Sequence, residues 1–276
     1  MKIILAPVDF SDTSTNSVLF AAELSRRSSA RLVIVNVLQK GEDENETKNK
    51  LKSLESELKK AIDSDLNCES FLVHGSLVTT LEKIIAVQQP DLIVMGTKGA
   101  SGLKKILIGS NTVHVISNTK LPVLVIPEVA RFDNFLKKGK NRIVLATDLD
   151  LLENENALDI LKEIALIIID PKVRVLSVRP KNKKLSGSKR AERDVLLSFF
   201  NPEIPSERVT VFSDSVIGGI DFYLSQKNTD TGLVAMIARD SGHLIQKHYT
   251  REMASHTHLP LLVLHDAKTN ALLLHL

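Results

Sequence analysis

The chain repeats itself, and this repeat constrains its fold more than any other feature. The segments 4–9 (ILAPVD) and 143–148 (IVLATD) are both apolar runs that end in Asp. The segments 121–126 (LPVLVI) and 259–264 (LPLLVL) both start with Leu-Pro, and each pair is separated by about 140 residues. Two landmarks at one spacing indicate two copies of one domain. We therefore expect a first domain at 1–128, a linker at 129–140, a second domain at 141–266 and a tail at 267–276.

Each copy alternates short apolar runs with amphipathic stretches. The runs are apolar at consecutive positions and rich in β-branched residues, which is typical of strands buried on both faces of a parallel sheet. They lie at 3–8, 32–38, 68–73, 92–95 and 123–126, and in the second copy near 142–147, 172–178, 208–213, 232–237 and 260–264. The segments 13–28 and 47–64 carry apolar residues at helical spacing. This alternation predicts two tandem α/β domains, each with three layers and a five-stranded parallel sheet.

Composition excludes several classes of function. Lys and Arg number 36 against 33 Asp and Glu, and aromatic residues make up only 4%, so neither a basic surface nor stacking platforms favour nucleic-acid binding. The apolar runs fall well short of the ~20 residues of a membrane span. The single cysteine, Cys68, cannot form an internal disulfide and is expected to be a buried, inert thiol. We expect a cytoplasmic protein with neither nucleic acid nor membrane as a partner.

A glycine-rich loop follows the fourth strand of the first copy. Its pattern is Gly-x2-Gly-x9-Gly-Ser, from Gly96 through Gly99 to Gly109. A helix is predicted to follow, with Ser110 or Asn111 as its N-cap. Glycine lets a ligand approach the backbone, and the free amides at a helix start favour an anion. The spacing matches neither the P-loop nor the dinucleotide fingerprint, so the loop predicts a phosphate site of a different type.

These motifs resemble the universal stress proteins of the UspA type, whose ATP-binding members carry this glycine pattern. The segment 6–11 (APVDFS) resembles the first-strand signature of that family, and 121–127 (LPVLVIP) resembles its last strand. The resemblance covers the first copy and, more weakly, the second. It implies the adenine nucleotide alpha hydrolase-like fold, with 121–127 and 259–265 paired antiparallel so that the chain forms a pseudo-dimer. A further homodimer of the whole chain stays open.

By this resemblance the first copy binds ATP together with a divalent metal, magnesium. Pro7, Val8 and Asp9 would border the adenine and ribose. Val37 would line the adenine pocket. The residues that would hold the ribose and phosphates are Met95, Gly96, Lys98, Gly99, Gly109, Ser110, Asn111 and Thr112. Two of these residues have an alternative role. Asp9 closes a strand, and such an Asp is often a helix N-cap; Lys98 lies in a loop, where a lysine is often solvated.

The second copy has lost the glycine pattern. The aligned replacements are Ile237 for Gly96, Asp240 for Gly99, Lys247 for Gly109 and His248 for Ser110. A carboxylate repels phosphate, and a β-branched residue disfavours a positive φ. We therefore expect one live nucleotide site per chain and a packing or partner-binding role for the second copy. Arg239, Lys247 and Arg251 are expected on a solvent-exposed face.

The other groups of polar residues give weaker evidence for a functional site. The histidines at 243, 248, 256, 258 and 265 lack metal-binding spacing and are expected to be scattered over the surface. The carboxylate pairs Asp9 with Asp12 and Asp148 with Asp150 favour capping over acid–base chemistry. The apolar end of the tail, 271–276 (ALLLHL), is expected to add to a sheet edge or to reach a second chain, and disorder of the tail is the alternative.

The sequence thus favours an ATP-binding regulatory protein of the stress response, read by an unknown protein partner. Nothing in it supplies a strong general base or a pocket for a second substrate, so catalysis is not expected. One alternative is a slow ATPase or an autophosphorylating protein, with Ser101, Ser110 or Thr112 as the acceptor. Another is an interaction scaffold that binds no ligand.

Overall fold

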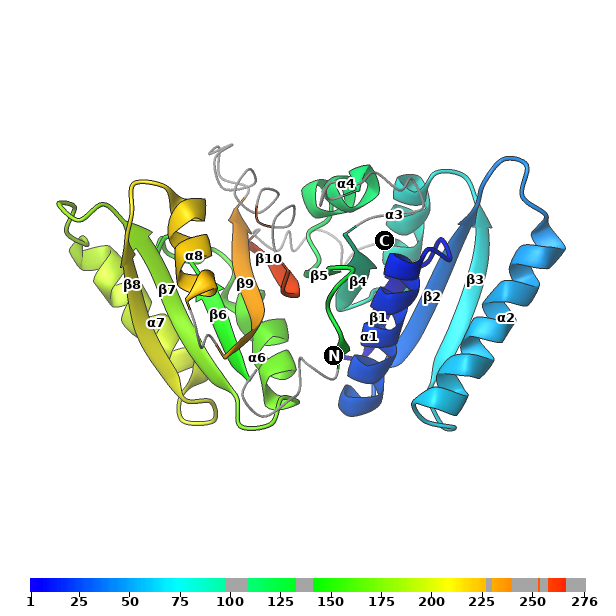
Figure 1. Cartoon of the computed structure of the whole chain (residues 1–276), viewed down its shortest axis with the longest axis horizontal. Coiled ribbons are helices and arrows are strands. Elements are labelled where there is room, and N and C mark those ends of the chain that lie inside the picture. Colours follow the sequence, from blue (N-terminus) through cyan, green and yellow to red (C-terminus); the bar gives the residue numbers. More distant parts are fainter. Residues whose placement is uncertain (98–108, 133–140, 227–229, 240–252, 254–257, 267–276) are drawn as a thin grey trace, which may run out of the picture.

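The computed structural model describes residues 1–97, 109–132, 141–226, 230–239, 253 and 258–266. Within them strands and helices alternate through both halves of the chain (Figure 1). The N-terminal half contains β1 (Ile3–Pro7), α1 (Asp12–Ser28), β2 (Arg31–Leu38), α2 (Glu44–Ala61), β3 (Cys68–His74), α3 (Leu77–Gln88), β4 (Leu92–Gly96), α4 (Ser110–Asn118) and β5 (Val123–Ile126). The C-terminal half contains β6 (Arg142–Ala146), the 3-10 helix η1 (Glu155–Leu158), α6 (Asp159–Leu166), β7 (Lys172–Arg179), α7 (Gly187–Phe200), β8 (Ser206–Phe212), α8 (Val216–Ser225), β9 (Thr231–Arg239) and β10 (Leu261–Asp266).

All these strands join one sheet. Its order is β3-β2-β1-β4-β5-β10-β9-β6-β7-β8, which makes it a 10-stranded sheet. Neighbouring strands are parallel within each half, and only the central pair, β5 and β10, is antiparallel, with Leu261 opposite Val125 and Val263 opposite Val123. The predicted five strands per copy and the antiparallel pairing of the last strands are therefore confirmed. The domain boundaries stay a prediction.

Helices cover both faces of the sheet, which explains the continuous apolar runs of the strands. Along β1, Ile4 and Ala6 pack on one side while Leu5 packs on the other, and each is fully buried. The first side also holds apolar residues of α1, α2, α6 and α7, and the second holds those of α3, α4 and α8. The predicted three-layer α/β architecture is confirmed.

The two halves repeat each other down to single backbone angles. Phe10 and Leu149, each following the Asp after the first strand of its half, adopt φ values of 57° and 60°. This left-handed conformation is uncommon for a residue with a large side chain. It turns the chain sharply from strand to helix, so both halves share the local geometry as well as the sequence landmark.

Two details of the helices differ from expectation. The second helix ends at Ala61 rather than at residue 64, with Ile62 as its C-cap. The helix after the glycine loop has Gly109 as its N-cap, not Ser110 or Asn111, and both of these lie within the helix. Gly109 supplies the extended φ and ψ of a cap without a side chain, and glycine is a favoured residue there.

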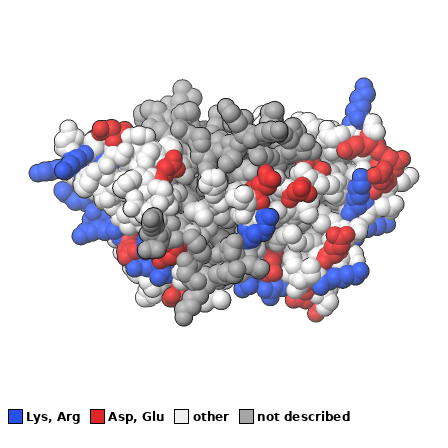
Figure 2. Space-filling view, viewed as in Figure 1, with Lys and Arg blue, Asp and Glu red and all other residues white. Residues whose placement is uncertain are grey.

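Charged residues of both signs are mixed on the face of the molecule shown in Figure 2. On the face shown in Figure 2, lysines and arginines occur together with acidic residues at both ends of the molecule. On this face such a mixture creates no extended field of one sign that would steer a polyanion. Among the helices that the structure describes, none is long and apolar enough to cross a membrane.

Candidate functional site

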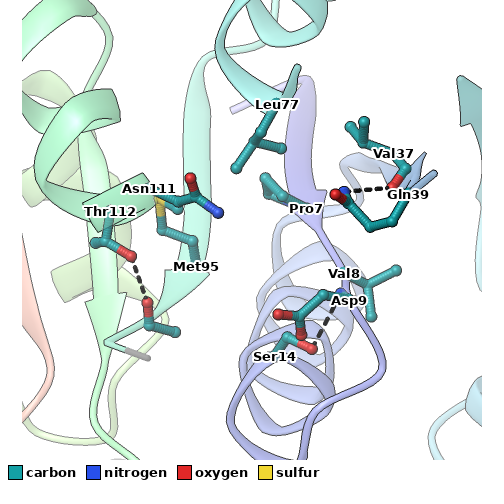
Figure 3. A pocket seen from close by; sticks show the side chains of 11 residues that line it. Pro7, Val8, Asp9, Ser14, Val37, Gln39, Leu77, Met95, Asn111 and Thr112 are labelled. Atoms are coloured by element: carbon teal, nitrogen blue, oxygen red, sulfur yellow. Dashed lines mark hydrogen bonds between the residues drawn. The ribbon is translucent and has the colours of Figure 1, made fainter. Parts of the chain in front are cut away.

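A pocket opens at the carboxyl ends of β1, β2 and β4, and we call it the strand-end pocket (Figure 3). Its empty volume, counting the open mouth, is about 510 Å³. Its lining residues are Pro7, Val8, Asp9, Ser14, Val37, Gln39, Leu77, Met95, Gly96, Asn111 and Thr112. The chain runs from β1 to β2 and β3 on one side, and returns through β4 and β5 on the other. The pocket therefore lies where the strand order reverses, the usual ligand position in open parallel sheets.

The ends of β1 and β2 bring their side chains to the pocket. Pro7 ends β1 and Val8 and Asp9 follow it, while Val37 lies near the end of β2 and Gln39 follows that strand. The register pairs Leu5 of β1 with Ile93 of β4, and this brings the ends of the two strands together. Met95 of β4 then faces the pocket from the opposite wall. Most of the apolar lining thus comes from strand ends that are fixed by the sheet, and Leu77 of α3 adds to it.

Asp9 is held in place by the turn that starts α1. Its Oδ1 accepts hydrogen bonds from the Ser11 backbone N–H at 3.0 Å and from the Ser11 hydroxyl at 2.6 Å. The Asp9 backbone N–H donates to the Ser14 hydroxyl at 3.2 Å. Ser11, not Asp9, is the N-cap, because its hydroxyl accepts from the Ser14 N–H. The carboxylate of Asp9 is therefore oriented at the pocket wall rather than used as the cap.

The start of α4 forms another wall of the pocket. Among the described residues no side chain caps this helix, so its first-turn amides keep their hydrogen-bonding capacity and the positive end of the helix dipole faces the site. The Thr112 hydroxyl donates to the Gly96 carbonyl at 2.8 Å and ties the helix to the end of β4. Asn111 projects its side-chain amide into the pocket (Figure 3). This wall is suited to a negatively charged group.

Gly96 lets α1 approach the end of β4. A Cβ atom added to Gly96 would lie 2.7 Å from the Thr13 Cγ2 and 3.0 Å from the Thr13 carbonyl oxygen. Real Cβ atoms essentially never come within 3.0 Å of another atom, and the contact with the carbonyl oxygen is also unusually tight, so a side chain here would displace Thr13 and the first turn of α1. Since that turn carries Ser14 and orients Asp9, Gly96 shapes the pocket without contributing a side chain.

We expect Gly96→Ala to reduce the free energy of unfolding by about 1–3 kcal/mol, the usual cost of overpacking a close contact. Gly187→Ala is the matched control, because a Cβ atom at Gly187 meets nothing within 4 Å and should change the stability by less than about 0.5 kcal/mol. Urea unfolding of the two variants measures both values. Equal stabilities would show that the contact with Thr13 relaxes without cost.

The structure gathers most of the residues predicted for the site. Eight of them line the strand-end pocket, namely Pro7, Val8, Asp9, Val37, Met95, Gly96, Asn111 and Thr112. Gly109 and Ser110 stand beside it, at the cap and first residue of α4. Lys98 and Gly99 lie outside the described residues.

Sequence reasoning missed three lining residues. Gln39 directly follows β2, whose end carries the predicted Val37, and its Nε2 donates to the Val37 carbonyl at 3.0 Å (Figure 3). Ser14 carries the signal of a Ser three residues after the N-cap Ser11. Leu77 carries no distinctive signal, because it is one of many apolar residues that begin a helix.

The C-terminal half differs at the position that corresponds to Gly96 and the strand-end pocket. The register pairs Gly96 with Ile126 in one half and Ile237 with Leu264 in the other, which confirms that Ile237 occupies the position of Gly96. A helix cannot approach the sheet there as α1 does. The chain accordingly starts its 3-10 helix only at Glu155, nine residues after the end of β6 at Ala146, whereas α1 starts five residues after the end of β1.

Arg239 fills the corresponding space, and the expectation that it is solvent-exposed is wrong. Its side chain is only 7% exposed, and its guanidinium donates to Asp266 Oδ2 and to the Leu151 carbonyl, both at 2.6 Å. The same group donates to the Asp150 carbonyl at 2.5 Å and lies 3.6 Å from Asp148 Oδ1. Asp148 is the counterpart of Asp9, so the chain's own cation lies beside it. Lys247 and Arg251 lie outside the described residues.

Further carboxylates surround this arginine. Glu192 of α7 is buried, and its burial raises its pKa, with Asp266 and Asp148 adding to the rise and Arg239 opposing it. Burial likewise raises the pKa of Asp148. In Asp150, burial acts to raise the pKa, but the hydrogen bond and charge of Lys189, which lies at 2.9 Å, lower it overall. The C-terminal half therefore contains a self-contained ion network where the N-terminal half has an open pocket.

We expect Glu192→Gln to be more stable than the wild type at neutral pH. Because folding raises the pKa of Glu192 above its ordinary 4.5, the wild type loses stability as the pH rises from about 4.5 through the folded value. The amide keeps an acceptor for the Leu152 backbone and carries no charge to desolvate. Urea unfolding from pH 4 to pH 8 should show the advantage of the variant growing with pH. An advantage that shrinks toward pH 8 would contradict the sign.

The prediction that the histidines are scattered over the surface is partly wrong. His265 lies in β10 and is buried, because every position of this central strand is covered on both faces. His258 is exposed, whereas His243, His248 and His256 lie outside the described residues. In the part of the chain that the structure describes, no three His, Cys, Asp or Glu side chains gather as metal ligands. Cys68 is buried as expected, and this burial raises its pKa.

The N-terminal half of the chain is similar in sequence to known proteins. The model of the universal stress protein family matches residues 1–127. A universal stress protein of Methanocaldococcus jannaschii is 28% identical, over 45% of this chain and 94% of its own. A second relative, from Bacillus subtilis, is 27% identical over 45% of this chain and 97% of its own. Both match over about half of this chain.

Solved structures extend the likeness to the whole chain. A universal stress protein from Archaeoglobus fulgidus covers 96% of this chain and 98% of its own with a TM-score of 0.70 at 20% identity. A functionally unknown protein from Pseudomonas aeruginosa covers 96% and 93% with a TM-score of 0.60 at 12% identity. A universal stress protein solved in complex with cAMP matches 45% of this chain and 96% of its own at 22% identity, with a TM-score of 0.38. The chain belongs to the universal stress protein family through its N-terminal half, and the whole chain has the fold of a tandem member.

Proposed function

We propose that the strand-end pocket binds ATP, and that the chain is a nucleotide-dependent regulatory protein. The observation that carries this proposal is the convergence of two features on one pocket. One is the start of α4, which no side chain caps among the described residues. The other is the switch point of the parallel sheet, where Pro7 and Met95 face each other. The first favours an anion and the second favours a flat organic group.

The two walls match the two ends of a nucleotide. The apolar surface of Pro7, Val37, Leu77 and Met95 suits the faces of a purine ring. Asn111 and the first-turn amides of α4 suit phosphate oxygens, because they donate hydrogen bonds at the positive end of a helix. The sugar then lies between them, near Asp9 and Gly96.

Magnesium fits this arrangement as a companion of the phosphates. Asp9 offers a carboxylate at the pocket wall, with one oxygen held by Ser11. Magnesium bound with a nucleotide typically takes one or two carboxylates, phosphate oxygens and waters rather than a cage of protein ligands. The absence of a three-ligand cluster among the described residues is compatible with such a site.

We propose that the C-terminal half binds no nucleotide in this way. Ile237 occupies the position of the essential glycine, and Arg239 is already paired within the chain. A ligand would have to break the ion pair between Arg239 and Asp266 before it could enter. This leaves the C-terminal half a packing or partner-binding role, and gives one nucleotide per chain.

We further propose that the bound nucleotide is sensed by a protein partner rather than turned over. Among the described residues that line the pocket, Asp9 is the sole candidate for a general base, and its Oδ1 is held by Ser11. Autophosphorylation is the second candidate, since α4 begins with a hydroxyl residue. Thr112 is a poor acceptor because its buried hydroxyl donates to the Gly96 carbonyl. Ser110 is exposed and is the better candidate, whereas Ser101 lies outside the described residues.

Calorimetric titration of the purified chain with magnesium and ATP tests this proposal. We expect one ATP bound per chain. Binding of two would show that the C-terminal half also accepts a nucleotide, and no binding by a folded chain would leave the scaffold as the alternative. Phosphate released during the same titration would favour the ATPase. ADP and AMP titrated in parallel show how much of the affinity comes from the terminal phosphates.

A further inference from the structure

An apolar groove lies between α3 and α4, and it shares no lining residue with the strand-end pocket. Its floor consists of Leu81, Ile85, Val115 and Leu121, and its volume is about 850 Å³ counting its open side. The remaining lining residues are polar, namely Glu82, His114, Asn118, Thr119 and Lys120. An apolar floor inside a polar rim is typical of a surface that another segment covers.

The described chain ends next to this groove. In the antiparallel pair, Val263 of β10 lies opposite Val123 of β5. Continuing this register by two residues places His265 opposite Leu121, which lines the groove. β10 ends at Asp266. The C-terminal tail, residues 267–276, therefore starts beside one end of the groove.

The sequence of the tail matches the groove. After four mostly polar residues it continues with ALLLHL at 271–276, which holds four leucines and no charged residue. Leu272 is six residues beyond Asp266, a span of up to about 20 Å in an extended chain. A covalent tether of this length gives the leucines an effective concentration in the millimolar range at the groove, far above that of any other chain at working dilution.

We propose that the C-terminal tail binds in the groove between α3 and α4 of its own chain. The leucines would then cover the half-buried Ile85 and Leu121 and remove their exposed apolar surface from water, while packing toward the buried Leu81 and Val115. The tail belongs to the C-terminal half, whereas the groove belongs to the half that carries the strand-end pocket. Both groove helices also line that pocket, through Leu77 of α3 and Asn111 of α4. The tail would thus contact the same two helices that the proposed ligand contacts.

Disulfide trapping tests this contact. Cys68 is the only cysteine, so Cys68→Ser gives a background without thiols. On it, Asn118→Cys at the rim is combined with Ala271→Cys in the tail. The control combines Ala271→Cys with Ser53→Cys, an exposed position of α2. We expect the intrachain disulfide of the rim pair to form at least about tenfold faster than that of the control pair.

The products distinguish the possible occupants of the groove. An intrachain bond located by peptide mass mapping supports the proposal. A bond between two chains, increasing with protein concentration, would show that a second copy supplies the tail and would overturn it. Equal rates for the rim and control pairs would also overturn it.

A second measurement avoids cysteines altogether. The triple variant Leu272→Asp, Leu273→Asp and Leu274→Asp makes the tail polar without touching the folded halves. Amides of α3 and α4 should exchange with deuterium about tenfold faster than in the wild type, while those of α7 stay unchanged. Thr269→Asp with Asn270→Asp is the control for added charge. Unchanged exchange in α3 and α4 would contradict the docked tail.

Discussion

Asn111→Glu is expected to weaken ATP binding by at least about 100-fold, because a carboxylate facing a phosphate costs several kcal/mol. Asn111 lines the strand-end pocket in the first turn of α4, and it is exposed enough to accept a longer side chain. A carboxylate in the first turn of a helix is favourable for the helix itself. The variant should therefore fold at least as well as the wild type, and calorimetric titration measures the loss of affinity.

Two controls separate charge from size and position. Asn111→Gln keeps the amide and lengthens the side chain, and its affinity should stay within about tenfold of the wild type. Asn118→Glu places the same carboxylate at the other end of α4, away from the pocket, and should leave the affinity unchanged. If Asn111→Glu binds ATP as tightly as Asn111→Gln does, the phosphates do not lie at the start of α4.

Arg239→Ala is expected to reduce the free energy of unfolding of the C-terminal half by about 3–5 kcal/mol, the usual cost of removing one member of a buried ion pair. The guanidinium binds Asp266 Oδ2 at 2.6 Å, and the Asp266 side chain is fully buried. Without Arg239 this carboxylate keeps only the backbone N–H groups of Glu153 and Asn154 as donors among the described residues, at 2.8 Å each. Urea unfolding followed by circular dichroism measures the loss.

The size of the effect identifies its cause. Arg26→Ala removes a surface pair with Glu23, in which both side chains are about one-third exposed, and should cost less than about 1 kcal/mol. The double variant Arg239→Met with Asp266→Asn removes both buried charges and should recover part of the stability that Arg239→Ala loses. A loss of less than about 1 kcal/mol for Arg239→Ala would show that water reaches Asp266 in solution.

The fold could be predicted from the sequence because its elements are locally encoded. Short runs of consecutive apolar residues such as those at 92–95 are typical of a strand that helices cover on both faces. The repeat then fixed the number of strands, and the Leu-Pro segments indicated the central pair. The helix start at Gly109 was misjudged because side-chain capping preferences ignore a cap that works through backbone conformation alone.

Tertiary contacts account for what the sequence did not predict. An arginine after a strand is usually exposed to solvent, so nothing in the sequence indicated that Arg239 is buried. Only the folded chain brings Asp266 and the Leu151 carbonyl to its guanidinium. Leu77 reaches the pocket because α3 packs beside β1 and β4, which no local pattern reports. Asp9 and Val37 were predicted because they lie at strand ends and match the family motif. Gln39 was missed because it lies in the loop directly after β2, where the family motif gives no signal.

The central seam of the sheet has an evolutionary consequence. In a symmetric homodimer every substitution appears in both subunits, so a mutation that destroys one pocket destroys both. Here β5 and β10 form the same kind of contact between the two halves of a single chain. Each half has its own coding sequence, so a substitution in one half leaves the other unchanged. The two halves can therefore differ at corresponding positions, as they do at Ile237 and Gly96. The seam also holds at any dilution, because neither half can diffuse away from the other.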